Sequence, residues 1–600
     1  MVKLSDVADI RRTFKDPSRF ARFNGKPSIT LDVVKRIGSN IIETNQQVRD
    51  LVAAKSTDWP QSVRIDFALD ESKVIFEVLG SLQASIITAI ALVMVICVAA
   101  LGTRSALLVG LAIPTSFMIG FLMVSLFGRT INNMLMFGMV LTVGMLVDGA
   151  IVIVEFADRK MAEGMPRREA YIAAAKRMFW PVASSTATTL AAFLPMLFWP
   201  GVPGKFMSNL PITVVIVLSA SLVTAMLFLP VLGGIFGKAD VSDSGNLKRL
   251  AATEKGDLKD LSGFTGSYVR LLSRLIQHPL KVAVVAAMMI VGTFYLYGKH
   301  NNGVTFFVET EPTQALIYVR ARGNLSVHEK LRLTKQVEDI VRAVEGVETV
   351  ATQAGSASQA GVGSGAGLDQ PKDAIGQLTI ELAPFGTRPA GKGILQTIRE
   401  RTAGLPGILV ETRQRENGPA TGKDIRLQVR ADSVTQATKV ATRVRQHLER
   451  ETTGLIDIED ETPLPGIEWT IKVNREEAGR YGADVISVGA MVQLVTNGVL
   501  VGTYRPDDSR DEVDIRVRLP ENQRAIAQLD DMRLRTANGL VPLSNFVTRE
   551  VKPAVDSIIR KDGRVSMYVK ATAAPGVLAD NKVKELDSWL KDQQWPDGVQ

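Results

Sequence analysis

One carboxylate interrupts a long apolar segment of this chain, Asp148 within MLMFGMVLTVGMLVDGAIVIV. It lies near the middle of a helix predicted over residues 131–156, and an ionised carboxylate at mid-membrane costs at least about 2.5–3.5 kcal/mol. Because burial favours the neutral form of a carboxyl group, such a group can take up and release a proton as its surroundings change. We therefore interpret Asp148 as a proton site. The alternative is a carboxylate that a neighbouring helix holds by hydrogen bonds for packing alone.

Two further features could take part in moving that proton. Glu155 follows Asp148 by seven residues, which places both on nearly the same helical face. It could serve as a proton exit, or cap the helix at the interface beside Arg159. Thr186 belongs to a polar stripe on the next apolar segment and could hydrate a relay, although packing of helices through small residues explains that stripe equally well. The stripe is Ser184, Ser185, Thr186, Thr188 and Thr189.

These groups need a bundle of membrane helices to position them. Six apolar segments approach or exceed the roughly 20 residues that a crossing needs. They are residues 84–101, 105–127, 131–156, 178–199, 209–236 and 281–298. Lys and Arg gather in the connections 157–177 and 237–280, which predicts that both are cytoplasmic and that 237–280 is an amphipathic linker. Residues 1–75 and 300–600 should then lie on the other side of the membrane.

The pattern changes after residue 298 to short strands and amphipathic helices. TQALIYVRARG, SVHEKLRLTKQVEDIVRAVEG and VETVATQ predict strand, helix and strand, and the unit recurs, which is typical of an α+β fold of the ferredoxin-like type. A third unit begins at DIRLQVRA. Between the first two, residues 354–373 are rich in Gly, Ala and Ser, and we expect a mobile loop there.

Composition excludes several functions. The net charge of +8 comes without a basic tract interleaved with aromatic residues, so no nucleic-acid partner is indicated. Cys97 is the single cysteine, which rules out a disulfide framework or a cysteine metal site. Only Met491, Met532 and Met567 could offer soft ligands after residue 300, and scattered methionines usually belong to a core. We find no nucleophile constellation, phosphate loop or metal-ligand spacing, so we expect neither an enzyme nor a cofactor.

An internal repeat links the two ends of the chain. VKLSDVADIRR at 2–12 matches VPLSNFVTREV at 541–551, FNGKPSITLDV at 23–33 matches RKDGRVSMYVK at 560–570, and WPQSV at 59–63 matches WPDGV at 595–599. The first copy leads into an apolar helix soon afterwards. We therefore expect the second copy to do so too, in a protein of which this chain is an incomplete portion.

This duplicated plan, together with NNMLMFGMVLTVGMLVDGAIVIVEFADRKMAEGM, resembles the RND (resistance-nodulation-cell division) superfamily, and most closely its hydrophobe/amphiphile efflux branch. The resemblance implies half of a duplicated multi-pass α-helical membrane protein, with α+β periplasmic porter and docking subdomains. It would lack the first helix and the C-terminal helices. The implied domains are the end of a first porter loop (1–75), membrane helices (76–236), a cytoplasmic linker (237–280), a further membrane helix (281–298), a second porter region (299–480), a docking-type subdomain (481–555) and a return to the porter region (556–600).

The resemblance also implies a function. Such proteins are proton-driven antiporters of the Gram-negative inner membrane, which export small molecules as homotrimers with a periplasmic adaptor and an outer-membrane channel. The family's usual second acid is replaced here by Gly149. By the same resemblance, its cationic partner would lie beyond Gln600. The alternative is an RND-derived scaffold or lipid-handling protein without proton-coupled transport.

The same resemblance makes the loop at 354–373 a candidate for substrate binding, through Gly355, Ser356, Gln359 and Gly361. Members that export drugs often place phenylalanines in that area, whereas this loop contains no aromatic residue. We therefore expect no pocket built from phenylalanines at this place.

Overall fold

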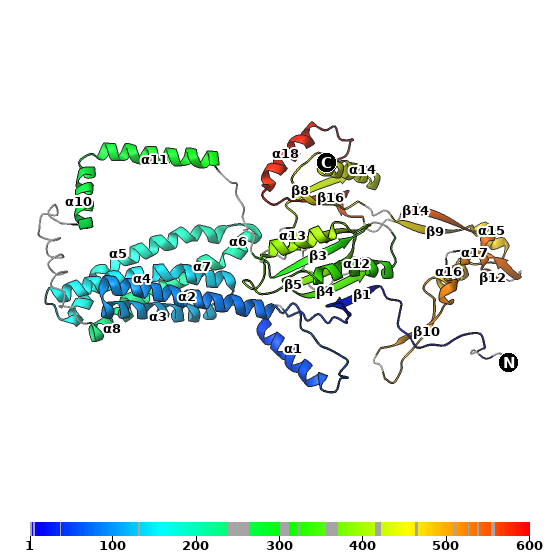
Figure 1. The fold of residues 1–600 in the computed structure, drawn as a ribbon, viewed down its shortest axis with the longest axis horizontal. Coiled ribbons are helices and arrows are strands. Elements are labelled where there is room, and N and C mark those ends of the chain that lie inside the picture. The colour runs from blue at the N-terminus through cyan, green and yellow to red at the C-terminus, as the bar shows by residue number, and fades with distance from the viewer. Residues whose placement is uncertain are drawn as a thin grey trace. The chain divides into compact units, whose positions relative to one another are not determined.

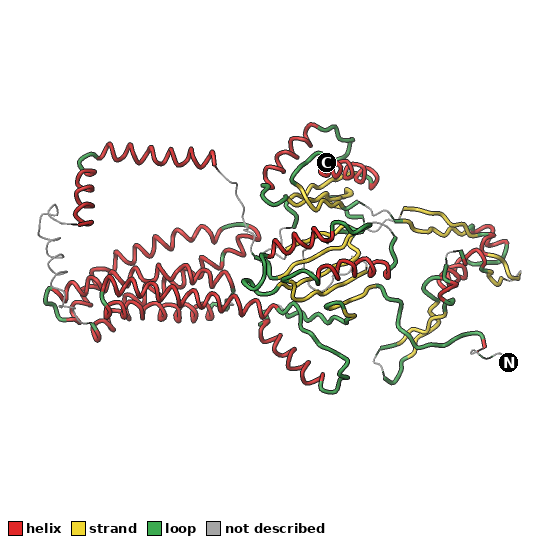
Figure 2. The backbone as a smooth tube through the Cα atoms, in the orientation of Figure 1, coloured by secondary structure: helices red, strands yellow, loops and turns green. Residues whose placement is uncertain are grey.

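The computed structural model describes residues 3, 6–36, 38–129, 132–237, 263–300, 311–321, 324–355, 370–414, 422–462, 466–508, 511–525, 527–536, 539–553 and 558–600. The chain forms two compact units (Figure 1). One comprises residues 32–309 and 416–419, and the other comprises 1–31, 310–415 and 420–600. The first unit is helical, and the second combines strands and helices (Figure 2).

Among the described residues of the first unit, six helices are long and apolar enough to cross a membrane, which confirms the expected multi-pass helical protein. They are longer than the apolar runs alone indicate: the first begins at Glu71 and the fourth at Arg167, where we expected residues 84 and 178. Charged residues continue a helix into water without breaking it, so hydropathy finds the membrane-crossing part and misses the rest. The helical elements of this unit, short ones included, are α1 (Ile41–Ser56), α2 (Glu71–Leu101), α3 (Thr103–Leu126), α4 (Asn133–Ala162), α5 (Arg167–Phe193), η2 (Leu194–Phe198), α6 (Gly201–Met207), α7 (Asn209–Val223), η3 (Thr224–Phe228), α8 (Leu229–Phe236), α10 (Gly263–Ile276) and α11 (Pro279–His300).

Local chemistry sets several helix ends. The Asp70 side chain accepts a hydrogen bond from the Ser72 amide and caps α2, and the Asn132 side chain accepts one from the Leu135 amide and caps α4. Gly102, at a φ of +82°, separates α2 from α3. The π-helical turn η3 ends at Phe228, two residues before Pro230, which has no amide hydrogen to continue the regular α-helical pattern.

Helix α4 lies at the centre of the bundle and packs against α2, α3, α5 and α7. Leu146 and Ile153 are among the largest fully buried side chains of the chain. Both lie on the packed side of α4. The contacts on this side fix the rotation of the helix about its axis and so determine which way its other side chains point.

The second unit contains the expected ferredoxin-like fold. Its six strands are ordered β2-β1-β4-β5-β3-β6, all neighbours being antiparallel, and within them β3-α12-β4-β5-α13-β6 forms the βαββαβ pattern. Figure 2 shows its two helices beside the sheet. The elements are β1 (Arg19–Phe23), β2 (Lys26–Pro27), β3 (Gln314–Arg320), α12 (Val327–Arg342), β4 (Val347–Gly355), β5 (Ala374–Leu382), α13 (Gly391–Thr402) and β6 (Leu409–Gln414).

A second sheet follows where we expected the third βαβ unit, with strands ordered β15-β16-β7 and β8 paired to β16. Its elements are β7 (Ile425–Ala431), α14 (Val434–Arg450), β8 (Leu455–Asp460), β15 (Arg560–Lys561), β16 (Arg564–Ala573) and α18 (Ala579–Asp592). We call the sheet formed by β1 to β6 with α12 and α13 the first porter body, and this second sheet with its helices the second porter body. Each has its own hydrophobic core.

Residues between β8 and β15 form a separate small core around Leu543 and Phe546. Most of the range 481–555 lies in this segment, and its assignment to a docking-type subdomain stays a prediction. The elements are β9 (Ile467–Val473), α15 (Arg475–Arg480), α16 (Val485–Val495), β10 (Val499–Tyr504), β11 (Val513–Val517), η5 (Glu521–Gln523), α17 (Gln528–Asp531), β12 (Arg533–Thr536), β13 (Gly539–Pro542), η6 (Leu543–Asn545) and β14 (Val547–Pro553).

The sequence repeat appears as a repeat of local structure. The β1–β2 hairpin turns through Asn24 and Gly25 at φ +46° and +81°, and the β15–β16 hairpin turns through Asp562 and Gly563 at +54° and +79°. Positive φ at both central residues is the two-residue hairpin geometry that Asn-Gly and Asp-Gly favour. A helix follows each hairpin, α1 in one copy and α18 in the other.

Candidate functional site

Asp148 lies midway along α4, between Asn133 and Ala162. On one side of this helix Val147, Ala150 and Val154 are buried in the bundle. Asp148 and Glu155 lie on the opposite side, and both are exposed. The two acids therefore share one face of α4, and the described helices leave that face uncovered.

The carboxylate of Asp148 has no hydrogen-bond or ion-pair partner within the described part of the chain. A buried charge without a partner is far more costly than a paired one. In a bilayer this carboxyl group must therefore be neutral, or another protein segment must cover it with polar or basic groups. The packing alternative, in which a neighbouring helix of the described bundle holds Asp148 by hydrogen bonds, does not describe this structure.

Gly149 is placed where α4 and α5 approach closely. A Cβ atom at this position would lie 2.9 Å from Cγ1 of Val182 on α5, which is closer than real Cβ contacts come. Glycine thus permits the present spacing of the two helices. A second acid at this position, as the family usually has, would require α5 to move or Val182 to be smaller.

We predict that Gly149→Ala lowers the free energy of unfolding by about 1–3 kcal/mol, because the added methyl overpacks the contact with Val182. Thermal unfolding of the purified membrane protein checks this. The matched control is Gly149→Ala combined with Val182→Ala, which makes room for the methyl and should recover part of the loss. A single variant as stable as the wild type would contradict the close contact.

Thr186 does not contact Asp148 directly. Its hydroxyl donates to the carbonyl of Val182, 2.9 Å away in the same helix, and Thr188 and Thr189 donate to the carbonyl of Ser185 in the same way. The polar stripe is thus hydrogen-bonded within α5. Its part in a relay stays a prediction, as does that of Glu155.

A polar cluster near the C-terminal end of α4 was not predicted from the sequence. Asp158 accepts a hydrogen bond from the hydroxyl of Ser105 on α3 at 2.5 Å. Tyr171 on α5 is fully buried, with its ring against Gly233 of α8, and its hydroxyl has no partner among the described residues. Ser105, Asp158 and Tyr171 belong to three separate helices, so no spacing in the sequence links them.

Of the residues proposed for substrate binding, Gly355 is the one that the structure describes. It ends β4 and pairs with Arg19 of β1, and a Cβ atom there would lie 2.9 Å from both the Cβ of Arg19 and the carbonyl oxygen of Ser18. This contact gives Gly355 a role in strand pairing. Ser356, Gln359 and Gly361 lie outside the described residues.

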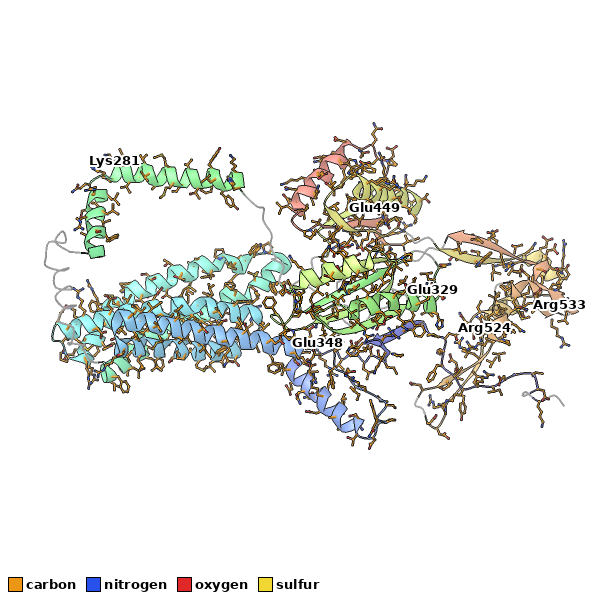
Figure 3. The ribbon with its side chains drawn as sticks, in the orientation of Figure 1. Lys281, Glu329, Glu348, Glu449, Arg524 and Arg533 are labelled. Atoms are coloured by element: carbon orange, nitrogen blue, oxygen red, sulfur yellow. The ribbon has the colours of Figure 1, made fainter. Side chains whose placement is uncertain are left out.

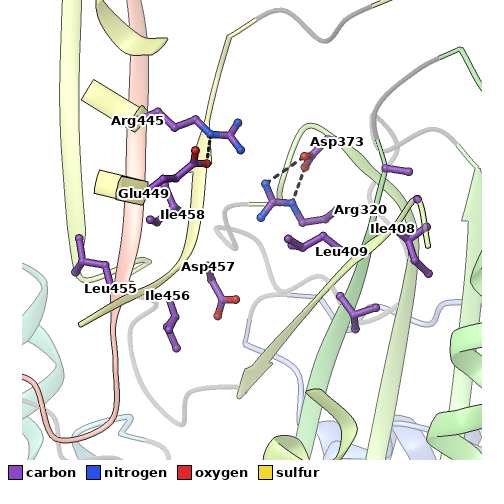
Figure 4. Close-up of a pocket in the computed structure, with 13 residues that line it drawn as sticks. Arg320, Asp373, Ile408, Leu409, Arg445, Glu449, Leu455, Ile456, Asp457 and Ile458 are labelled. Carbon is purple, nitrogen blue, oxygen red and sulfur yellow. Dashed lines mark hydrogen bonds and ion pairs between the residues drawn. The ribbon is translucent and has the colours of Figure 1, made fainter. Parts of the chain in front are cut away.

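A cavity of about 580 Å³ lies between the two porter bodies (Figure 4). Its walls are aliphatic and charged, and none of the 13 described residues that line it is aromatic. Asp373, which ends the segment proposed for substrate binding, is one of them. The first body contributes Arg320, Ala321, Asp373, Gly407, Ile408, Leu409 and Val410, and the second contributes Arg445, Glu449, Leu455, Ile456, Asp457 and Ile458.

The charged groups of this cavity are paired. Arg320 donates to Asp373 at 2.7 Å and to Glu411 at 2.9 Å, and Arg445 donates to Glu449 at 2.6 Å. Burial raises the pKa of Asp457, and the negative charge of Glu411 raises it further, although Arg399 donates to it at 3.0 Å. Among the described residues, no group of three or more His, Cys, Asp or Glu is placed to hold a metal ion.

Comparison with known proteins places the whole chain in one family. The model of the AcrB/AcrD/AcrF family matches residues 1–600. The chain is similar to proteins named multidrug resistance protein MdtC from Yersinia enterocolitica, Yersinia pestis and Yersinia pseudotuberculosis. Each is 24% identical over 552 residues, which cover 91% of this chain and 52% of the relative. The chain thus spans about half the length of the curated relatives that it matches.

Proposed function

Because the chain belongs to the AcrB/AcrD/AcrF family, we propose that it serves proton-coupled efflux of small molecules across a bacterial inner membrane. Asp148 is the proton site of this proposal. The observation that carries it is a carboxylate at the middle of an apolar helix, on a face that the described helices leave uncovered. Such a group gains or loses a proton according to what covers it.

The magnitudes support coupling through one carboxyl group. Moving one charge through a potential of about 100 mV supplies about 2.3 kcal/mol, and placing an ionised carboxylate at mid-membrane costs at least about 2.5–3.5 kcal/mol. The two energies are similar, so a proton gradient can drive the change between a covered, charged state and an open, neutral one. Gly149 leaves a single acid at this place, which favours fewer protons per cycle than a pair of acids would carry.

The cavity between the porter bodies is the substrate site that the geometry supports best. Its aliphatic walls and paired charges suit small amphiphiles, and the absence of aromatic side chains among its described lining residues disfavours large planar substrates. The relatives' name, multidrug resistance protein, suggests that several compounds are exported. We extend this to the chain as part of the proposal.

The proposed partners follow from the family. We place the protein in the lipid bilayer of the inner membrane, with the porter bodies in the periplasm, as a homotrimer that works with a periplasmic adaptor and an outer-membrane channel. The alternative is a scaffold or lipid-handling protein without proton coupling, and the replacement of the second acid by Gly149 favours it. In that case export or lipid binding would not depend on a proton gradient.

Uptake of a fluorescent amphiphile into everted membrane vesicles that contain the native protein discriminates between the two functions. We expect uptake on energisation, and its loss when a protonophore collapses the gradient. Uptake that continues at the same rate without a gradient would contradict the proposed coupling.

A further inference from the structure

The two porter bodies meet through charges. Each body is stabilised by its own apolar core, around Leu378 and Ile380 in the first and around Val429 and Val569 in the second. Between them, strand β6 of the first body and strand β8 of the second present buried charged side chains. Interfaces of this polar kind allow the bodies they join to move relative to each other.

Lys423, just before β7, occupies the centre of this contact, with its side chain 3% exposed. Its ammonium lies 3.2 Å from Glu411 on β6 and 3.3 Å from Glu459 on β8, and it also donates to the carbonyl of Asp457. The side chains of Glu411 and Glu459 are 0% and 6% exposed. A single buried cation thus joins two carboxylates on different bodies.

Further charges border the same contact. Arg413 on β6 donates to Glu411 at 2.6 Å and to Glu459 at 3.4 Å, which makes a second link between the bodies. We call Glu411, Arg413, Lys423 and Glu459 the ionic seam. Around it, Arg320 on β3 pairs with Glu411 and Asp373, and Arg399 on α13 pairs with Asp457.

The charges of this group balance while Lys423 is present. Arg320, Arg399, Arg413 and Lys423 face the same number of acids, which are Asp373, Glu411, Asp457 and Glu459. Without the ammonium, one negative charge in a buried site has no counter-charge. Such a site can lower its energy by letting the bodies separate, so that water reaches the carboxylates, or by taking up a proton.

We propose that Lys423 is a positioning residue that sets the width of the cavity between the porter bodies. Asp457, Ile456 and Ile458 on β8 line that cavity from the second body, and Leu409 and Val410 on β6 line it from the first. The ionic seam joins these same two strands, so its length determines how far apart the two walls stand. The link between this width and substrate entry rests on the proposed function. The effect of Lys423 on the width does not.

The test measures the distance between the bodies in the native protein by double electron–electron resonance. Spin labels at Gln396→Cys on α13 and Gln446→Cys on α14 report it, since both side chains are exposed. The native cysteines, Cys97 among them, are replaced first. We expect Lys423→Met to shift the distance distribution to longer values and Lys423→Arg to leave it unchanged.

A double variant separates charge from packing. Lys423→Met with Glu459→Gln removes one charge of each sign, so the distance should return to that of the wild type. In Lys423→Met alone, acidification from about pH 7 to about pH 4.5 should also restore it, because a carboxylate of the seam then takes up a proton. In the wild type, where the Lys423 ammonium lies close to both carboxylates, acidification over this range should not shorten the distance.

Three outcomes would overturn the proposal: an unchanged distance in Lys423→Met, equal widening in the double variant, or widening that does not respond to pH. None of these measurements depends on transport. A protein that moves no protons but shows the predicted distances would contradict the proposed function and leave Lys423 in its positioning role.

Discussion

Replacing Asp148 with Asn is expected to abolish uphill export by the native protein. Asparagine has nearly the same size and keeps a polar group at the uncovered face of α4, but it cannot release a proton. Loss of one coupled proton removes about 2.3 kcal/mol of driving force at 100 mV, which corresponds to about a 50-fold lower concentration ratio of substrate across the membrane. The steady-state accumulation of a fluorescent amphiphile in everted vesicles measures this ratio.

Two matched variants test whether the effect belongs to the carboxyl group at this position. Asp148→Glu keeps the group and should retain part of the export. Glu155→Gln removes the other acid of the same exposed face, near the end of α4, and should have a smaller effect than Asp148→Asn. Wild-type accumulation by Asp148→Asn would show that the group is not needed.

Replacing Glu411 with Gln should destabilise the first porter body more than any surface substitution. Glu411 is fully buried and lies 2.9 Å from Arg320, 2.6 Å from Arg413 and 3.2 Å from Lys423. Removal of one partner from a buried ion pair costs about 3–5 kcal/mol, because it leaves buried charge uncompensated. Hydrogen exchange of the β3 and β6 amides should therefore accelerate by about 10²–10⁴-fold.

The control is Glu329→Gln on α12 (Figure 3). This substitution removes a carboxylate that pairs with Arg332 at 2.6 Å at the surface. Solvent screens an exposed pair and leaves it little effect on stability, so exchange in β3 and β6 should barely change. Equal effects of the two substitutions would contradict the role assigned to the buried network.

The difference in free energy of unfolding between the wild type and Glu411→Gln should also depend on pH. Burial alone would raise the pKa of Glu411, but the charges of Lys423, Arg413 and Arg320 outweigh it and hold this pKa below its usual value. The folded protein therefore binds the proton less well than the unfolded chain does. The stabilisation is fully present above the unfolded pKa of about 4.3 and is lost as the pH falls through the lower folded value. The difference between wild type and Glu411→Gln should shrink accordingly in acid.

Much of the fold could be predicted from the sequence because its signals are local. Apolar runs of about 20 residues identify membrane helices, and alternating strands with amphipathic helices identify the βαβ units. The helix ends were less accessible: Arg167 begins α5 because a charged segment continues the helix beyond its apolar part. The common face of Asp148 and Glu155 followed from helical periodicity, and the structure has it on the uncovered side of α4.

The cavity and its charges could not be predicted in the same way. Arg320, Glu411 and Glu459 are far apart in the sequence, and strands β3, β6 and β8 of two sheets bring them to the same contact. Each of them alone has the appearance of an ordinary surface charge on a strand or loop. The reason for Gly149 could not be predicted either. The sequence shows that the family's second acid is missing there, and only the packing of α4 against α5 explains why a glycine fits.

Proton movement in liposomes tests the central claim most directly. The native protein is reconstituted with a pH indicator inside the vesicles, an outward substrate gradient is imposed and the internal pH is followed. We predict substrate-dependent proton movement for the wild type and none for Asp148→Asn. Equal substrate-dependent proton movement in both proteins would contradict the assignment of Asp148 as the proton site.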